Sequence, residues 1–434
     1  MPIQLRSCRI CGNTDLELVL DLGVQALTGV FPSDKTAPIT AGPLELVKCA
    51  QGEGSDACGL LQLGHSYPFE EMYGEGYGYR SGLNATMVRH LEETVGKIRS
   101  LVELEEGDLI VDVGSNDGTL LGFYPEGPEL VGVDPTAAFF SEFYRSDITV
   151  VPEFFSAETV RGAVRGKKAK VVTSIAMFYD LEEPMRFMQE VYDLLTDDGI
   201  WVFEQSYMPT MLDNLAYDTV CHEHLEYYGL KQIRWMVDRV GFSIQDIEFN
   251  TVNGGSFSVT VAKRPDICRG NTSLIERTLR EEERRRLDTV EPYLAFAASA
   301  QEHRKLLVDL VRRIREQGGS IVGYGASTKG NVILQYCGFT AEEIPFIAEV
   351  NETKFGRFTP GTGIPIISEE EAKKTEPDFL MVLPWHFRDF FVAKEAEFIS
   401  GGGRLLFPLP MIEIYPGDSG FPDWKAHDPR PDHV

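Results

Sequence analysis

The sequence lacks long apolar runs, and no local run of Lys and Arg forms an extended basic stripe. It has no stretch of about 18 apolar residues, which is roughly what a membrane-spanning helix needs. The first residues, MPIQLRSCRICG, have neither the basic start nor the apolar segment of a secretory signal. Lys and Arg number 41 against 67 Asp and Glu, and the formal net charge of −26 opposes binding to a phosphate backbone. We therefore expect a cytoplasmic protein that binds neither membranes nor nucleic acids.

Cysteine is scarce and odd in number, with seven residues in 434. Disulfides are disfavoured in a reducing compartment, so clustered thiols indicate a metal site. Two pairs of cysteines lie near the N-terminus, namely Cys8, Cys11, Cys49 and Cys58. Four thiolates suit tetrahedral zinc, and such a closed site is structural rather than catalytic. The alternatives are four unrelated buried thiols, or a site in which His65 provides the fourth ligand.

The length of the chain exceeds what one hydrophobic core usually supports, so two or three domains are expected. The first 80 residues are short apolar runs broken by Gly and Pro, which predicts loops and short strands. Residues 82–105 predict a helix, because apolar residues recur there at every third or fourth position. These residues are Leu83, Met87, Leu91, Val95 and Ile98.

Strands and helices alternate over two later regions. Apolar runs such as LIVDVG, ELVGVD, KVVTSIAM and GIWVFEQ predict parallel strands, and VGFSIQDIEFN with SFSVTVAK predicts a final hairpin. A second alternation runs from SIVGYGASTKGNVIL to RLLFPLP, after two amphipathic helices that part near Pro292. We thus expect an α/β protein composed of a zinc-binding N-terminal domain (1–80), a Rossmann-like domain (81–270), a helical connector (271–318), a second Rossmann-like domain (319–412) and a flexible tail (413–434).

The segment VDVGSNDGTLL is a strand that ends in a glycine turn and leads into a helix. Gly114 and Gly118 allow a ligand to approach the backbone, with Asn116 between them, and Asp134 at the end of the next strand can accept both hydroxyls of a ribose. The turn lacks a full G-x-G-x-x-G, and Asp117 would repel a pyrophosphate. These features favour S-adenosylmethionine over a dinucleotide. The alternative is a tight turn without a ligand.

The segment YDTVCHEHLEYY places two histidines and three acids after the fourth expected strand. A loop this rich in titratable groups beside a cofactor cleft is a candidate active site. His222 and His224 lack the i, i+4 spacing of a zinc protease, so we interpret one imidazole as a base that the neighbouring Glu223 orients. His222 fits equally well as a histidine satisfied at the rim of the sheet.

The second Rossmann-like region begins with a strand, a glycine-rich turn and a cation. Gly325, Ser327, Thr328 and Lys329 suit a diphosphate group. His386, which follows the strand FLMVLP, is a further candidate for contact with a base or a phosphate. The alternative is a turn that only packs against its own sheet.

Taken together, these motifs resemble the sugar-nucleotide C-methyltransferases, which make branched-chain deoxysugars. The likeness extends over nearly the whole chain, through CRICG, EMYGEGYGYRSG, VDVGSNDGTLL, YDTVCHEHLEYY, NGGSFSVTVA, IVGYGASTKG and GGGRLLFPLP. It implies S-adenosylmethionine as methyl donor and a nucleoside-diphosphate 4-keto-6-deoxyhexose as substrate, methylated beside the ketone. By resemblance, His224 is the base, Glu223 its partner and Tyr79 a contact to the sugar or its oxyanion. The second domain would hold the nucleotide half.

Two positions depart from the pattern of these enzymes. Cys221 and His222 stand where a Tyr is expected shortly before the Glu-His pair, and Asp180 stands where a His is expected after the fourth strand. The sugar, its stereochemistry or the groups around the enolate can differ accordingly. A helix N-cap is the other role considered for Asp180.

Two other functions compete with methyl transfer. An NAD-dependent oxidoreductase would use the GYGAST turn, with Glu349 as the acid on the next strand. A zinc-stabilised protein that senses a nucleotide without turnover is the non-catalytic alternative, but the His/Glu loop would then have no use. We expect a monomer, because one chain can form the whole cleft.

Overall fold

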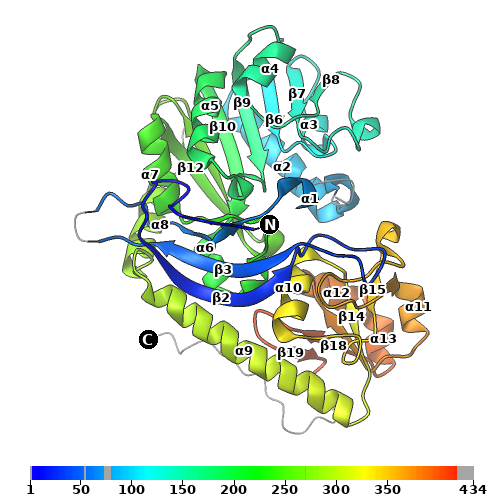
Figure 1. Cartoon of the computed structure of the whole chain (residues 1–434). Helices are drawn as coiled ribbons and strands as arrows, with labels where there is room; N and C mark the ends of the chain where they lie inside the picture. The colour runs from blue at the N-terminus through cyan, green and yellow to red at the C-terminus, as the bar shows by residue number, and fades with distance from the viewer. Residues whose placement is uncertain (1, 53–54, 73–79, 269, 418–434) are drawn as a thin grey trace.

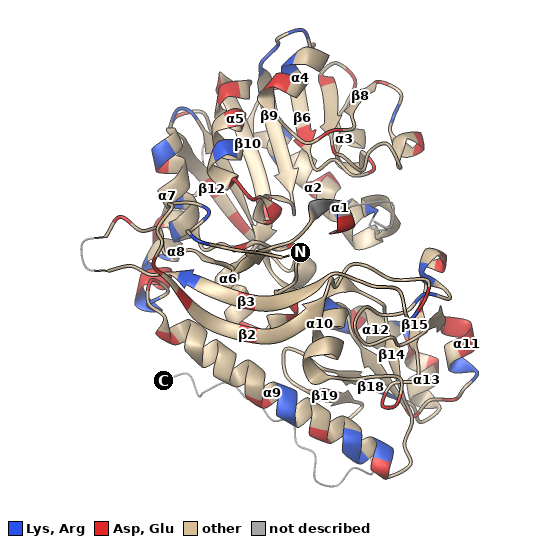
Figure 2. Cartoon of the chain, viewed as in Figure 1, with Lys and Arg blue, Asp and Glu red and all other residues tan. Residues whose placement is uncertain are grey.

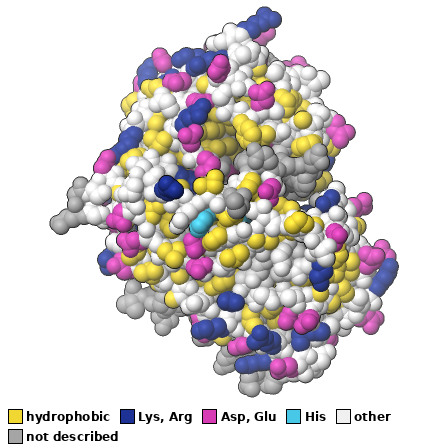
Figure 3. Space-filling view, in the orientation of Figure 1, with side chains coloured by type: hydrophobic (Ala, Val, Ile, Leu, Met, Phe, Trp, Pro, Cys, Tyr) yellow, Lys and Arg dark blue, Asp and Glu magenta, His cyan; other side chains and the backbone are white. Residues whose placement is uncertain are grey.

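The computed structural model describes residues 2–52, 55–72, 80–268 and 270–417. It has a seven-stranded sheet at the top of Figure 1, a four-stranded sheet across the middle and a six-stranded sheet at the lower right. Among the described residues, no helix is both long enough and apolar enough to cross a bilayer. On the face seen in Figure 3, acidic, basic and apolar side chains are interspersed, so the negative net charge is not concentrated there.

The N-terminal segment forms longer strands than the sequence predicted. Its four-stranded sheet has the order β11-β4-β3-β2. The strands are β2 (Leu16–Ala26), β3 (Ala41–Cys49), β4 (Leu61–Leu63) and β11 (Glu226–Tyr227), with β1 (Ile3–Gln4) and β5 (His65–Ser66) paired beside them and helix α1 (Phe69–Met72) after them. The register of β2 against β3 shifts twice, between Leu18 and Leu20 and between Asp21 and Val24. These irregularities, together with internal Gly and Pro, hid the strand alternation from sequence reasoning.

The first α/β domain has the sheet order β12-β13-β10-β9-β6-β7-β8. Its strands are β6 (Leu109–Val113), β7 (Glu129–Val133), β8 (Ile148–Val151), β9 (Ala169–Ile175), β10 (Leu195–Ser206), β12 (Ser243–Asn250) and β13 (Ser256–Ala262). Only β13 runs antiparallel to both of its neighbours, as the predicted hairpin requires. The sequence missed β8, whose run ITVV is short and partly exposed.

Helices cover this sheet on both faces. They are α2 (Ala85–Leu101), α3 (Thr119–Gly122), α4 (Ala157–Ala163), α5 (Pro184–Leu194) and α7 (Leu230–Val240). Helix α6 (Met208–Asp213) instead packs in the core that the N-terminal segment shares with the second domain. The predicted apolar face of α2 is buried from Met87 to Ile98. Asn84 caps this helix by accepting hydrogen bonds from the next backbone N–H groups, so Leu83 lies before it and is 64% exposed.

Two helices connect the α/β domains, α8 (Thr272–Arg284) and α9 (Glu291–Glu316), with Pro292 in the first turn of α9. Acidic and basic side chains follow one another along α9, the long helix at the bottom of Figure 2. Its other face, which includes Leu307, Leu310 and Ile314, is buried. The predicted helical connector is therefore an amphipathic helix pair.

The second α/β domain has the sheet order β16-β15-β14-β17-β18-β19. The strands are β14 (Ile321–Tyr324), β15 (Ile347–Glu349), β16 (Ile366–Ser368), β17 (Phe379–Val382), β18 (Arg404–Phe407) and β19 (Glu413–Tyr415), and the helices are α10 (Thr328–Cys337), α11 (Glu369–Lys373), α12 (Arg388–Lys394) and α13 (Ala396–Ser400). Residues 413–415, which we had placed in the tail, instead form β19 antiparallel to β18. A run of three alternating residues between prolines was too short to predict a strand.

The N-terminal segment packs into both α/β domains. Its cysteine end, including Cys8 and Cys58, shares a hydrophobic core with the first domain. Its β2–β3 end shares a core with α9 and the second domain. The side-chain amide of Gln335 on α10 exchanges hydrogen bonds of 2.7 and 3.1 Å with the backbone of Ala26. One segment thus connects the two domains.

Candidate active site

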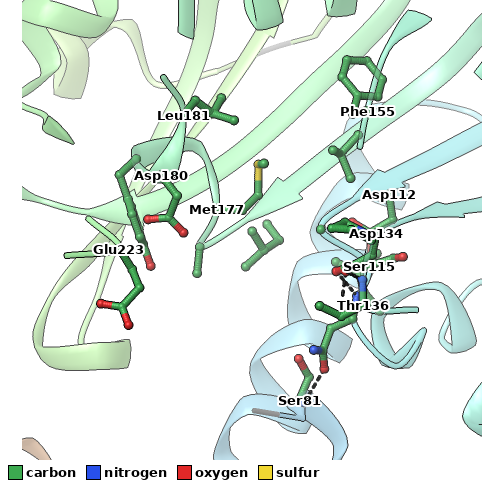
Figure 4. A pocket seen from close by; sticks show the side chains of 18 of the residues that line it. Ser81, Asp112, Ser115, Asp134, Thr136, Phe155, Met177, Asp180, Leu181 and Glu223 are labelled. Atoms are coloured by element: carbon green, nitrogen blue, oxygen red, sulfur yellow. Dashed lines mark hydrogen bonds between the residues drawn. The ribbon is translucent and has the colours of Figure 1, made fainter. Parts of the chain in front are cut away.

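A cavity of about 440 Å³ lies at the carboxyl ends of the central strands of the first domain. Parallel sheets of this kind bind ligands at that edge. Figure 4 shows two groups of side chains: Asp112, Ser115 and Asp134 on one side, and Asp180 with Glu223 on the other. Met177 and other apolar residues lie between the two groups. The cavity can therefore hold two polar ligand groups with an apolar passage between them.

The predicted glycine turn lines one side of the cavity. Gly114 has φ +76°, and a Cβ there would lie 2.9 Å from Cγ of Met177, so both the conformation and the space require glycine. Asn116 also has a positive φ of 50°, and its side chain accepts a hydrogen bond of 2.9 Å from the backbone N–H of Ser81. The turn thereby connects the cavity to the segment that precedes α2.

Asp134 lies where the sequence placed an acid for a ribose. Its Oδ2 accepts a hydrogen bond of 2.9 Å from Asn116 N–H, and its Oδ1 accepts one of 2.7 Å from Thr136 N–H. Oδ1 also accepts a hydrogen bond of 2.6 Å from the Thr136 hydroxyl, so the second lone pair of Oδ2 is the one left for a ribose hydroxyl. Sequence reasoning missed Asp112, which also lines the cavity. Burial raises the pKa of Asp112 to about 7, and an acid inside the apolar run LIVDV was the available signal.

Two residues of the predicted turn, Asp117 and Gly118, are not among the residues that line the cavity. Asp117 Oδ1 accepts a hydrogen bond of 2.5 Å from the Thr119 hydroxyl, and Asp117 Oδ2 accepts one of 2.9 Å from Gly82 N–H. A Cβ on Gly118 would lie 2.6 Å from the ring of Tyr144. Asp117 and Gly118 therefore shape the start of α3, and their contact with the donor stays a prediction.

His224 lies in the cavity wall, opposite the glycine turn. Its Nδ1 donates a hydrogen bond of 2.9 Å to the carbonyl oxygen of Thr219, so Nε2 carries the lone pair of the neutral ring. The ring of Tyr179 packs against it edge-on at 4.5 Å. Burial, followed by the charge of Lys329, lowers the pKa of His224 to about 4. The imidazole is therefore neutral and can accept a proton.

Glu223 does not orient His224, contrary to our interpretation of the sequence. Its carboxylate accepts a hydrogen bond of 3.4 Å from the Thr28 hydroxyl, and the Thr219 carbonyl orients the imidazole instead. A backbone carbonyl leaves no trace in a sequence motif. Burial raises the pKa of Glu223. A Cβ on Gly29 would collide with this carboxylate, so the N-terminal segment reaches the site through residues 28–29.

The positions that depart from the resemblance lie around His224. Asp180 and Cys221 line the cavity. Helix α5 begins at Pro184 with Glu183 as its N-cap, so Asp180 does not have the N-cap role considered for it from the sequence. His222 is buried and does not line the cavity, and its ring meets Tyr67 edge-on at 4.5 Å. Tyr79 lies outside the described residues.

The second domain contributes the start of α10 to the same cavity. Thr328 and Lys329 line it, and Lys329 Nζ donates a hydrogen bond of 2.7 Å to the backbone oxygen of Asn253. Ser327 is instead the N-cap of α10, and Gly325 faces Pro384. His386 is also not among the residues that line the cavity. Burial and the charge of Lys329 lower the pKa of His386 to about 3. Of the predicted substrate residues, Thr328 and Lys329 therefore line the cavity. Gly325, Ser327 and His386 do not.

The four N-terminal cysteines converge as predicted. The sulfur atoms of Cys8, Cys11, Cys49 and Cys58 all lie within 4.8 Å of one another. The amide of Asn13 donates a hydrogen bond of 3.4 Å to the sulfur of Cys49, as second-layer groups around metal thiolates do. His65 lies elsewhere, 3.6 Å from a carboxylate oxygen of Glu45, so it is not the fourth ligand. This donor set fits structural zinc.

Three family models match the chain in succession. They describe a zinc binding domain (residues 8–73), a methyltransferase domain (residues 87–247) and a C-methyltransferase C-terminal domain (residues 251–410). The C-methyltransferase NovU of Streptomyces niveus is 29% identical over 416 residues, which are 95% of this chain and 97% of NovU. The likeness therefore includes all three parts of the molecule.

Solved structures of methyltransferases give a more distant likeness. The plantazolicin methyltransferase BpumL in complex with SAH is 11% identical, with a TM-score of 0.33 over 40% of this chain and 82% of that chain. A methyltransferase from Bacillus halodurans is 12% identical, with a TM-score of 0.32 over 39% of this chain and 99% of that chain. These scores carry no argument of their own. The three family models and NovU thus make the chain similar, in all three of its parts, to C-methyltransferases with an N-terminal zinc domain, and they support S-adenosylmethionine-dependent C-methylation as its activity.

Proposed function

We propose that this C-methyltransferase acts on a nucleoside-diphosphate 4-keto-6-deoxy sugar and methylates the carbon next to the ketone. One observation carries the proposal: the neutral imidazole of His224 lies in the same cavity as the donor-type turn at Gly114 and Asp134. A ketone acidifies its neighbouring C–H bond, so a neutral imidazole is a sufficient base for it. The motif resemblance to sugar-nucleotide enzymes supports the class of substrate.

The donor side of the cavity fits S-adenosylmethionine, which supplies an electrophilic methyl group when bound. Asp134 would hold the ribose hydroxyls, while Gly114 allows close approach of the donor to the backbone. The buried Asp112 adds a further carboxyl group at the same edge. The apolar stretch near Met177 would exclude water from the path between the two substrates.

The chemistry on the substrate side belongs to the loop that carries His224. Nε2 accepts the proton from the substrate carbon, while the Nδ1–H bond to the Thr219 carbonyl keeps the ring in place. The resulting carbanion equivalent attacks the methyl group in line, and S-adenosylhomocysteine leaves with the electron pair of the broken C–S bond. Glu223 and Asp180 offer acceptors for sugar hydroxyls in this part of the cavity. By resemblance, Tyr79 would contact the sugar as well.

The second domain would hold the nucleotide half of the substrate. Gly325 and Ser327 directly precede α10 in the sequence, and the charge of Lys329 acts on His386. None of these three residues lines the described cavity. A substrate that extends from His224 past Thr328 would reach them. Because one chain forms every described wall of the cavity, we propose that the monomer is active.

Incubation with methyl-labelled S-adenosylmethionine and a panel of sugar nucleotides tests this function. We expect label only with 4-keto-6-deoxy sugar nucleotides, and carbon–carbon coupling to the labelled methyl in the ¹³C NMR spectrum of the product. The corresponding 4-hydroxy sugar nucleotide, which has no ketone and cannot enolise, is the matched control. Label bound to oxygen or nitrogen, or turnover of the control, would contradict the proposal.

A further inference from the structure

Lys329 occupies a position that helix stability does not favour. It is the second residue of α10, a ten-residue helix whose N-cap is Ser327. The N-terminal end of a helix carries a partial positive charge, so a cation there is unfavourable. The side chain nevertheless reaches into the cavity of the other domain. A role outside the helix is required to explain it.

The contacts of Lys329 leave part of its ammonium group available. Within the described residues, its hydrogen-bond acceptor is the backbone oxygen of Asn253, at 2.7 Å. An ammonium group has three donors, so two remain for a ligand. Asp218, which is fully buried and accepts a hydrogen bond of 2.7 Å from Trp385 Nε1, opposes the lowering of the Lys329 pKa that burial causes. The cavity that His224 lines therefore also holds a partly buried cation with open donors.

We propose that the ammonium group of Lys329 binds the ketone oxygen of the substrate and stabilises the enolate formed when His224 removes the neighbouring proton. The inference rests on the proposed function. The enolisable carbon is bonded to the carbonyl carbon, so the base and the group that binds the oxygen must line the same cavity. Lys329 and His224 both do so. Cys221, in the same wall, is only a weak donor.

The electron balance of this step needs no further reactant. The C–H bond breaks, its proton goes to Nε2 of His224, and its electron pair forms the carbon–carbon double bond. The π pair of the ketone moves onto oxygen, where the Lys329 ammonium opposes the new charge. In the reverse direction the double-bond pair takes a proton from His224. Without a methyl donor, the enzyme therefore exchanges the substrate hydrogen with solvent.

Hydrogen exchange in D₂O separates this role from phosphate binding. Thymidine-diphosphate-4-keto-6-deoxyglucose is incubated with enzyme and S-adenosylhomocysteine, and ¹H NMR follows the protons next to the ketone. We expect exchange with the native enzyme and none with His224→Gln. Lys329→Met should lower the exchange rate about 10²-fold or more, whereas Lys329→Arg should recover part of it. Binding of S-adenosylhomocysteine to each variant, measured by calorimetry, confirms that the fold is intact.

The possible outcomes are distinct. Exchange by Lys329→Met at the native rate, with only a raised KM, would overturn the inference and indicate a phosphate contact. If the native enzyme neither exchanges nor methylates this probe or any other 4-keto sugar nucleotide, the proposed function fails instead. A structural role for Lys329 predicts weaker S-adenosylhomocysteine binding in both variants and no rescue by arginine. Such a result would also overturn the inference.

Discussion

The two α/β domains share one local construction. In each, the first strand ends at a glycine with positive φ, Gly114 (+76°) or Gly325 (+85°). In each, an acid at or just after the end of the neighbouring strand accepts a hydrogen bond from the turn. Asp134 accepts one of 2.9 Å from Asn116 N–H, and Glu349 accepts one of 2.8 Å from Ala326 N–H. Judged only by their sequence and local backbone, the two domains would therefore be assigned the same function.

Their surroundings make the two turns different. The turn at Gly114 opens onto the cavity, and Asp134 lines it. Glu349 is also held by Val350 N–H at 2.7 Å, and Lys354 Nζ donates a hydrogen bond of 2.7 Å to the oxygen of Ala326. Neither Glu349 nor Gly325 lines that cavity, whereas Lys329 of the following helix does. The second domain thus completes a site that belongs mainly to the first.

The largest expected effect distinguishes His224 from His386. Both histidines are partly buried, and burial followed by the charge of Lys329 lowers the pKa of both. We expect His224→Gln to lower kcat about 10²–10⁴-fold, as loss of a general base does. His386→Gln should act mainly on KM, because His386 does not line the cavity. Steady-state kinetics with the labelled donor measures both, and equal losses of kcat would break the distinction between the two domains.

The zinc site tests how the N-terminal segment joins the domains. Cys49→Ser removes one of four converging thiols, and we expect zinc affinity to fall more than about 100-fold, beyond the effect of a second-layer change. Asn13→Ala removes only the 3.4 Å bond to Cys49, so about a 10-fold loss is expected. Competition with a chelator measures both affinities. Because the cysteines pack in the core of the first domain, Cys49→Ser should also lower Tm. Native zinc content in Cys49→Ser would contradict the four-thiolate site.

The matched acids provide a smaller and more specific contrast. Asp134→Asn removes a charged acceptor at the donor side, and we expect the Kd of S-adenosylmethionine to rise about 10-fold, since a bond to a charged group contributes roughly 1.5–3 kcal/mol. Glu349→Gln should leave this Kd within about twofold, because Glu349 does not line the cavity. Calorimetry with the two variants tests the pair. Equal weakening would mean that both turns take part in donor binding.

The sequence predicted more of the fold than of the site. Continuous apolar runs such as LIVDV and ELVGV are recognisable as strands, whereas the short β8 and β16 are not. The cysteine spacing was sufficient to predict the convergence of the four thiols. Which side of the turn Asp117 faces depends on a backbone N–H 35 residues away, and His224 is oriented by a backbone carbonyl of its own loop, which side-chain identities do not reveal. The entry of Lys329 into the cavity depends on how the domains pack, which no local pattern encodes.

The smallest expected effect concerns the charge of His224 between pH 8 and pH 5. The groups that face it are Lys329 from α10, the Thr219 carbonyl, the Tyr179 ring, and Glu223 with Cys221 of its own loop. Burial and the Lys329 charge lower its pKa to about 4, so at pH 5 about nine-tenths of the imidazole is neutral, against about 3% for a pKa of 6.5.

We therefore expect the His224 ring protons to titrate in NMR with a midpoint near pH 4, while a solvent-exposed imidazole would titrate near 6.5. The His224→Gln spectrum assigns the signal. Lys329→Met removes the cation that disfavours the imidazolium, so the midpoint should move upward in that variant. Unlike a rate profile, this measurement is not confounded by Glu223, whose pKa burial raises. A native midpoint near 6.5, or no movement in Lys329→Met, would show that the second domain does not act on the base of the first.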